Sequence, residues 1–192
     1  MSNFQINERG FWESTDAEGH LHDTMLCQGI IKILKHENSS TIVDFGCGMG
    51  DYARTLIQNG ISCEAFDGNP NTESLTNGLG KVLDFSLDFD LNKKFDAVLS
   101  LEVGEHIPKE YEQIFLNNIC KHTDKTLILS WAVIGQGGDG HVNCQNNDYI
   151  INELTKRGFR IDVYNSNFLR QVSLLPWFKN TIMVFRKEKI SK

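Results

Sequence analysis

Four side chains in the middle of the chain have the residue types and the spacing to do chemistry. Glu102, Glu105 and His106 stand close together, and His141 follows in a glycine-rich segment. Imidazole and carboxylate groups can move a proton to or from a reacting hydroxyl. The same side chains could instead hold a divalent cation, which would lower the pKa of a bound hydroxyl. The set predicts a reaction centre, with Glu102, His106 and His141 as catalytic residues.

A glycine-rich turn forms a second set. Gly46, Gly48 and Gly50 alternate after an apolar run that contains Asp44. Glycines let the backbone approach a ligand closely, and the start of the helix that follows offers free N–H groups. Asp67 stands 23 residues after Asp44, where an acid at the end of a second strand can hold both hydroxyls of a ribose. This spacing predicts a nucleotide-binding element.

The segments that must position these residues alternate between strand and helix patterns. We expect strands at 41–45, 62–66, 81–85, 95–101, 126–133, 159–164 and 181–186. We expect helices at 21–36, 51–59, 108–120 and 147–157, a short helix through residue 75, and a long loop at 165–179. The alternation predicts an α/β fold with a single doubly wound, seven-stranded, mostly parallel sheet and helices on both faces.

The glycine turn and the acid after it resemble the first two motifs of class I methyltransferases, which use S-adenosylmethionine (SAM). The resemblance implies that the turn holds the methionine part of SAM and that Asp67 holds the ribose. It further implies that Asp84 binds the adenine amino group and that Phe85 packs against the ring. The cofactor-binding residues expected on this basis are Asp44, Gly46, Cys47, Gly48, Gly50, Asp67, Gly68, Asp84, Phe85 and Leu101.

The Glu-x-x-Glu-His spacing at 102–106 resembles a motif of the ubiquinone-pathway O-methyltransferases and of the plant-type small-RNA 2′-O-methyltransferases. In both families the motif is part of a divalent metal site, and in the RNA family a later histidine completes it. The resemblance implies a Mn²⁺ or Mg²⁺ site made of Glu102, Glu105, His106 and His141. It also implies O-methylation of a hydroxyl, with the metal chelating the acceptor.

Several alternatives stay open at this point. His141 could act as a general base without a metal, or the chain could be a non-catalytic SAM-binding subunit. A nicotinamide-dependent oxidoreductase is disfavoured, because Asp51 interrupts its glycine pattern and the chain has no Tyr-x-x-x-Lys. His20, His22 and Asp23 could bind a metal, or His22 and Asp23 could simply cap the helix that follows.

Composition limits the remaining possibilities. Among 192 residues the net charge is −6, and residues 1–150 carry 22 acidic against 10 basic side chains. This acidity makes a nucleic acid an unlikely partner, because nucleic-acid affinity depends on neutralising phosphates. A small polar acceptor fits better. The five cysteines lack a Cys-x-x-Cys pair, and we expect reduced thiols in a cytoplasmic protein.

The sequence predicts one domain over residues 1–192. Within it we expect an N-terminal lid and helix segment at 1–40, a SAM-binding half at 41–135 and an acceptor-side half at 136–192. No apolar run approaches the roughly 20 residues of a membrane span, and the start of the chain has no signal-peptide pattern. The oligomeric state is not indicated.

Overall fold

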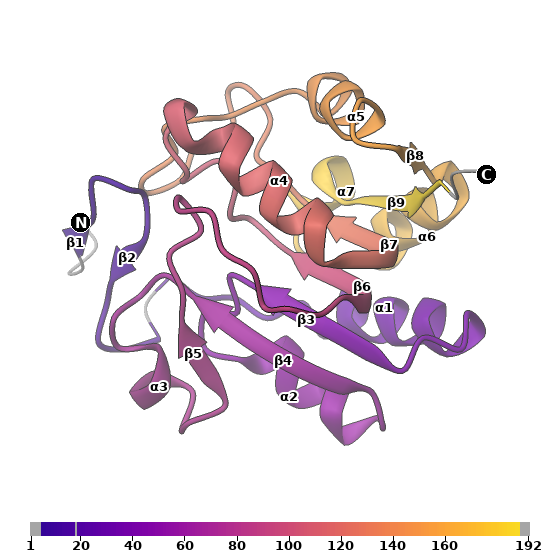
Figure 1. Ribbon diagram of the computed structural model, residues 1–192, viewed down its shortest axis with the longest axis horizontal. Helices are drawn as coiled ribbons and strands as arrows, with labels where there is room; N and C mark the ends of the chain where they lie inside the picture. The colour runs from indigo at the N-terminus through magenta and orange to yellow at the C-terminus, as the bar shows by residue number, and fades with distance from the viewer. Residues whose placement is uncertain (1–4, 18, 189–192) are drawn as a thin grey trace.

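The computed structural model describes residues 5–17 and 19–188, with a seven-stranded sheet at its centre (Figure 1). The spatial order of the strands is β5-β4-β3-β6-β7-β9-β8. In chain order they are β3 (Thr41–Phe45), β4 (Ser62–Asp67), β5 (Gly80–Val82), β6 (Phe95–Ser100), β7 (Thr123–Leu129), β8 (Phe159–Ile161) and β9 (Met183–Lys187). Strands β3 to β7 are parallel, and β9 runs antiparallel to its neighbours β7 and β8. The predicted fold class is confirmed.

Helices cover both faces of this sheet. They are α1 (Thr24–His36), α2 (Asp51–Gln58), α3 (Thr72–Leu75), α4 (Glu112–His122), α5 (Asn147–Thr155), α6 (Val163–Val172) and α7 (Phe178–Thr181), with a 3-10 turn η1 at Lys109–Tyr111. One apolar core joins Phe115 of α4 and Ile150 of α5 to the sheet. A second core joins Ile30 of α1 and Leu169 of α6 to the opposite face. Strands buried on both sides need continuous apolar runs, which is the pattern of β6.

The order of the strands places a crevice at one end of the sheet. From β3 the chain adds β4 and β5 on one side, and it then returns to add β6 and β7 on the other. Ligands of doubly wound sheets bind outside the carboxyl ends of the strands where this order reverses. In Figure 1 those ends point to the left, toward a small hairpin of β1 (Gln5–Ile6) and β2 (Trp12–Glu13).

The expectation of a long loop near the end of the chain is wrong. Residues 165–179 are not one long loop, because α6 occupies Val163–Val172 and α7 begins at Phe178. Asp162 starts α6 by accepting a hydrogen bond from the backbone N–H of Asn165 at 3.0 Å, a capping signal that the sequence analysis overlooked.

Other element boundaries shift by a few residues. The strand expected at 126–133 runs over Thr123–Leu129, and the strand expected at 81–85 covers Gly80–Val82. The helix expected at 108–120 is split into η1 and α4. The predicted domain 1–192 includes residues 1–4, 18 and 189–192, which lie outside the described ones, and its division at 40 and 135 stays a prediction. None of the helices in the described part of the chain is long and apolar enough to cross a bilayer.

Asp23 joins two distant parts of the fold and is 1% exposed. Its Oδ1 caps α1 by accepting from the N–H of Leu26 at 2.8 Å. Its Oδ2 accepts from the N–H groups of Leu174 and Leu175 at 2.7 and 2.8 Å. One carboxylate therefore fixes the start of α1 against the segment after α6, which supports the capping alternative for this residue.

Asp23→Ala should lower the free energy of unfolding by about 2–4 kcal/mol, because it removes a helix cap and leaves two further backbone donors without an acceptor. Urea unfolding measures the change. The exposed substitution Glu110→Ala serves as control and should stay within about 0.5 kcal/mol of the wild type. Equal stability of the two variants would contradict this role of Asp23.

Candidate active site

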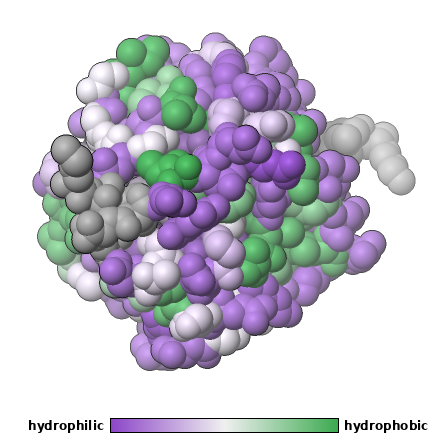
Figure 2. Space-filling view, turned by 90° about the vertical axis from the view of Figure 1, so that its left-hand side faces the viewer, coloured by the Kyte–Doolittle hydropathy of each residue, from purple (hydrophilic) through white to green (hydrophobic). Residues whose placement is uncertain are grey.

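A cavity of about 410 Å³ lies at the carboxyl ends of the parallel strands. Its size falls within the roughly 300–1,000 Å³ range of small-molecule sites. Residues from the N-terminal segment, the glycine turn, the loop after β6 and the loop after β7 line it together. The face of the molecule at this end is mostly hydrophilic, with separate hydrophobic patches (Figure 2).

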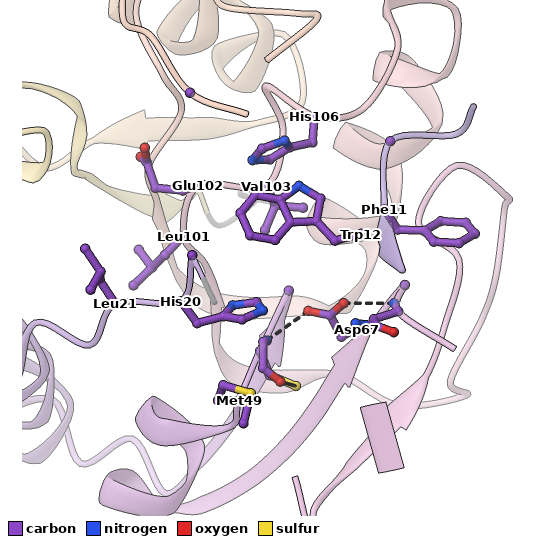
Figure 3. Close-up of a pocket in the computed structure, with 18 of the residues that line it drawn as sticks. Phe11, Trp12, His20, Leu21, Met49, Asp67, Leu101, Glu102, Val103 and His106 are labelled. Carbon is purple, nitrogen blue, oxygen red and sulfur yellow. Dashed lines mark hydrogen bonds between the residues drawn. The ribbon is translucent and has the colours of Figure 1, made fainter. Parts of the chain in front are cut away.

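The glycine turn is tied to the end of β4. Gly46 and Cys47 both donate their N–H groups to the carbonyl of Phe66, at 2.8 and 3.0 Å. Gly48 donates its N–H to Oδ2 of Asp67 at 2.8 Å (Figure 3). Gly46 has a φ of +92°, and a Cβ there would lie 2.1 Å from the side chain of Val103. The turn therefore needs glycine both for its conformation and for the space around it.

Asp67 is placed to bind a polar ligand at this turn. Its Oδ1 accepts from the N–H of Asn69 at 2.9 Å, while its Oδ2 holds Gly48. Each carboxylate oxygen has a second lone pair available. The side chain is half-buried and lines the cavity, so the geometry is compatible with the predicted hold on a ribose.

Asp44 is a buried acid beside the same turn. It is 3% exposed, and its Oδ2 has no hydrogen-bond partner among the described residues. Burial, followed by the negative charge of Asp67, raises the pKa of Asp44 to about 8. Without a ligand this carboxyl group is therefore protonated at neutral pH.

The predicted adenine site is already engaged in contacts within the protein. Oδ2 of Asp84 accepts from Arg9 at 2.9 Å, and Oδ1 accepts from the backbone and side chain of Ser86 at 2.8 and 2.6 Å. Phe85 is 5% exposed and packs in the core beside Phe45. The adenine roles of both residues stay predictions. Of the ten expected cofactor residues, all but Gly50 line the cavity, and Gly50 forms the N-cap of α2.

Three members of the expected metal set meet at the other end of the cavity. One ligand atom from each of Glu105, His106 and His141 lies within 4.8 Å of the others. Nδ1 of His106 lies 3.2 Å from the carbonyl of Gly140, and Nδ1 of His141 lies 3.3 Å from that of Gln136. A carbonyl oxygen can only accept a hydrogen bond, so each Nδ1 carries the hydrogen and each Nε2 keeps a lone pair. The two Nε2 atoms can serve as bases or as metal ligands.

Burial governs the charges in this acid–imidazole cluster (Glu105, His106 and His141). Burial and the neighbouring His141 lower the pKa of His106 to about 4, so its ring is neutral at physiological pH. Burial and the charge of Glu102 raise the pKa of the Glu105 carboxyl well above its usual range. Neither oxygen of Glu105 makes a hydrogen bond of good geometry within the described chain.

Glu102 lies next to Glu105 and acts on its carboxyl group, but it is not grouped with the three possible ligands. Its Oε2 accepts from Nε2 of Gln136 at 2.9 Å, and in Figure 3 its side chain extends away from His106. Its φ of +52° is unusual for a residue with a side chain. The structure therefore gathers three of the four expected metal ligands and leaves Glu102 as a neighbour that lines the same cavity.

The N-terminal segment forms the roof of the cavity. The rings of Trp12 and His20 lie 5.4 Å apart, and those of Trp12 and His106 lie 5.5 Å apart. Figure 3 shows the indole between the glycine-turn side and the His106 side of the cavity. The sequence predicts that this segment folds over the site, but no local motif indicates Arg9, which also lines the cavity.

Two tryptophans that could have been substrate platforms differ in position. Trp131 is fully buried and donates its Nε1–H to the carbonyl of Asn143 at 2.6 Å. Trp177 lines the cavity together with Phe178. The loop after β7 adds further lining residues, among them Gln136 and Asp139.

Comparison with known proteins decides the family. A model described as a methyltransferase domain matches residues 19–125, which is more than half of the chain. The chain belongs to this methyltransferase family. The nicotinamide-dependent oxidoreductase is thereby set aside. No curated protein shows detectable sequence similarity to this methyltransferase.

Solved structures share the fold of the methyltransferase at low sequence identity. The magnesium protoporphyrin IX methyltransferase (ChlM) of Synechocystis PCC 6803, with bound SAH, is 18% identical with a TM-score of 0.64, over 84% of this chain and 82% of its own. The sugar N-methyltransferase KedS8 of Streptoalloteichus sp ATCC 53650 is 12% identical with a TM-score of 0.71, over 90% of each chain. The methyltransferase domain of bacterial CtHen1-C is 14% identical with a TM-score of 0.60, over 85% of this chain and 97% of its own.

The raised pKa of Asp44 makes a prediction about stability. The folded state keeps this carboxyl protonated up to pH about 8, whereas the unfolded chain ionises it above about pH 4. The free energy of unfolding should therefore fall as pH rises from 4 to 8. Asp44→Asn cannot ionise, so its stability relative to the wild type should improve by about 1–3 kcal/mol between pH 5 and pH 8.

Urea unfolding at the two pH values measures this difference. Asp88→Asn provides the control, because Asp88 is exposed and pairs with Lys121 at the surface. Parallel pH profiles for Asp44→Asn and the wild type would mean that Asp44 titrates normally in the folded protein.

Proposed function

We propose that this methyltransferase transfers the methyl group of SAM to a hydroxyl oxygen of a small polar metabolite. The observation that carries the proposal is the continuity of one cavity. The glycine turn with Asp44 and Asp67 lines one end, and His106 and His141 of the acid–imidazole cluster line the other, with Glu105 buried beside them. A donor at the first end and an acceptor at the second would lie in the same enclosed space.

The donor end suits SAM by its charge. SAM carries a sulfonium and an ammonium group, and carboxylates compensate such cations. Asp44 offers a buried oxygen without a partner, and an ammonium group beside it would favour its ionised form. Asp67 presents both carboxylate oxygens at the end of β4, as a ribose diol requires. Membership of the family indicates methyl transfer, and Asp44 and Asp67 are the residues that fit the donor.

The acceptor end can take up the proton that the reaction releases. The acceptor oxygen attacks the methyl carbon, the carbon–sulfur bond breaks, and sulfur keeps the electron pair. The hydroxyl proton passes to Nε2 of His141 or His106, since a backbone carbonyl beside each Nδ1 leaves Nε2 as the proton acceptor. Holding the acceptor in line with the methyl group supplies much of the remaining acceleration.

The same cluster fits a divalent cation. Glu105, His106 and His141 would hold it, and the two unpartnered oxygens of Glu105 give the site an acid ready to ionise. When bound, the cation would chelate two neighbouring acceptor oxygens and lower the pKa of one. Imidazole-rich ligation favours Mn²⁺ over Mg²⁺ by ligand softness. The alternative is a metal-free reaction with His141 as the general base.

The side chains that line the cavity near the acid–imidazole cluster indicate the chemical class of the acceptor. Gln136 and Asp139 offer polar groups, and Trp177 offers an aromatic face. This combination suits a small polar molecule better than a lipid or a nucleic acid. The sugar N-methyltransferase KedS8 among the structural neighbours acts on nitrogen, so an activity screen should contain amino sugars beside diols and catechols. A non-catalytic subunit would have no need of a proton acceptor beside the donor.

Asp67→Ala should weaken SAM binding by at least about tenfold, because it removes the ribose acceptor and frees the N–H of Gly48 that fixes the turn. Isothermal titration calorimetry measures the dissociation constant. Asp88→Asn, at an exposed position outside the cavity lining, should bind SAM as the wild type does. Unchanged affinity of Asp67→Ala would contradict the donor site.

Chelation distinguishes the two versions of the acceptor chemistry. With a metal, a strong chelator should abolish turnover, added Mn²⁺ should restore it, and Glu105→Gln should weaken metal binding by about tenfold or more. Without a metal, the chelator should have no effect and His141→Gln should lower kcat by about 10²–10⁴. Metal content and initial rates provide the measurements, with Glu110→Gln as an exposed control. Full activity of both cavity variants would refute the assigned acceptor chemistry.

A further inference from the structure

The donor end of the cavity is dominated by acids. Asp44, Asp51 and Asp67 line it. Arg9 also lines the cavity, but its guanidinium is paired with Asp84 at 2.9 Å. Among the described lining residues near the glycine turn, His20 and His22 each have a ring nitrogen that could donate to an anion.

Both histidines are held by packing and have an unused ring nitrogen. A Cβ on Gly48 would lie 2.6 Å from Nδ1 of His20, so this ring rests directly on the glycine turn. The ring of His22 meets that of Tyr52 edge-on at 4.7 Å. The Nε2 atoms of His20 and His22 are buried and have no hydrogen-bond partner in the described chain. A buried donor without a partner costs about 1–3 kcal/mol, which a bound ligand would remove.

The proposed donor carries an anion that this end of the cavity must accommodate. SAM has an α-carboxylate next to the ammonium group that Asp44 suits. Acids nearby repel a carboxylate, and the turn's own donors are largely occupied. Gly46 and Cys47 donate to Phe66, and Gly48 donates to Asp67. Donors from another segment are therefore needed.

We propose that His20 and His22 together bind the α-carboxylate of the methyl donor. The N-terminal segment is then the part of the protein that recognises the amino-acid end of SAM. The inference rests on the proposed use of SAM. The two histidines follow Trp12 in the roof, and Figure 3 shows His20 beside Asp67 under the indole. The roof therefore closes on a donor with a carboxylate and discriminates against one without it.

A ligand pair isolates the carboxylate. S-adenosylhomocysteine keeps the carboxylate, and its decarboxylated analogue keeps the amine, ribose and adenine. The wild type should bind S-adenosylhomocysteine at least about tenfold more tightly, which corresponds to about 1.4 kcal/mol. The double variant His20→Phe/His22→Phe keeps ring packing but removes the donors. It should bind the decarboxylated analogue as the wild type does and lose the preference for the carboxylate. Calorimetry with both ligands gives all four dissociation constants.

The outcomes separate this proposal from the proposed function. If the wild type binds neither ligand, the use of SAM itself fails. If the wild type binds both equally, or the double variant keeps the preference, the histidines do not read the carboxylate. If the variant loses both ligands equally, the rings only pack the roof, and the proposal is also refuted. The control His36→Phe, at the far end of α1, should match the wild type with both ligands, and thermal melts with decarboxylated ligand report folding of each variant.

Discussion

The hydrogen bonds that tie the glycine turn to the end of β4 are the constraint on which the site depends. Three successive N–H groups of the turn, from Gly46 to Gly48, bond to Phe66 and Asp67. They bring the turn after β3 against the adjacent strand and fix the direction in which α2 begins. Parallel pairing of β3 with β4 and β6 then sets the depth of the crevice. A change at this junction would move the floor of the cavity and both acids on it.

Two buried acids lower the stability of the protein without its ligands. Asp44 and Glu105 are buried at opposite ends of the cavity, and burial raises the pKa of each. Burying a neutral acid costs less free energy than burying a charged one, but a buried acid without hydrogen-bond partners is still unfavourable. Cations suit both positions, an ammonium group at one and a metal or a polarised acceptor at the other. The two acids that lower the stability of the protein without ligands would therefore favour the binding of cationic ligands.

Sequence patterns predicted what is local and missed what comes from distant contacts. The alternation of strands and helices gave the sheet, because periodicity reports burial directly. The glycine turn and Asp67 were found because their spacing within one strand–turn–helix–strand unit is fixed. The pairing of Arg9 with Asp84 joins residues 75 positions apart, and no local pattern signals it. The positive φ of Glu102 and its hydrogen bond from Gln136 likewise come from the loop conformation, which spacing alone could not show.

The roof over the cavity sets an order of events. Trp12 lies between His20 and His106, and the ion pair of Arg9 with Asp84 joins the same segment to the loop after β5. A donor of the size of SAM would contact the underside of these rings, and we expect the segment to close on the bound donor. The exposed ion pair contributes little to closure, whereas the packing of Trp12 and the bonds made to the donor contribute more. The bound donor then stabilises the closed position of the segment. The acceptor would contact this segment once the donor is bound. We therefore expect the donor to bind before the acceptor.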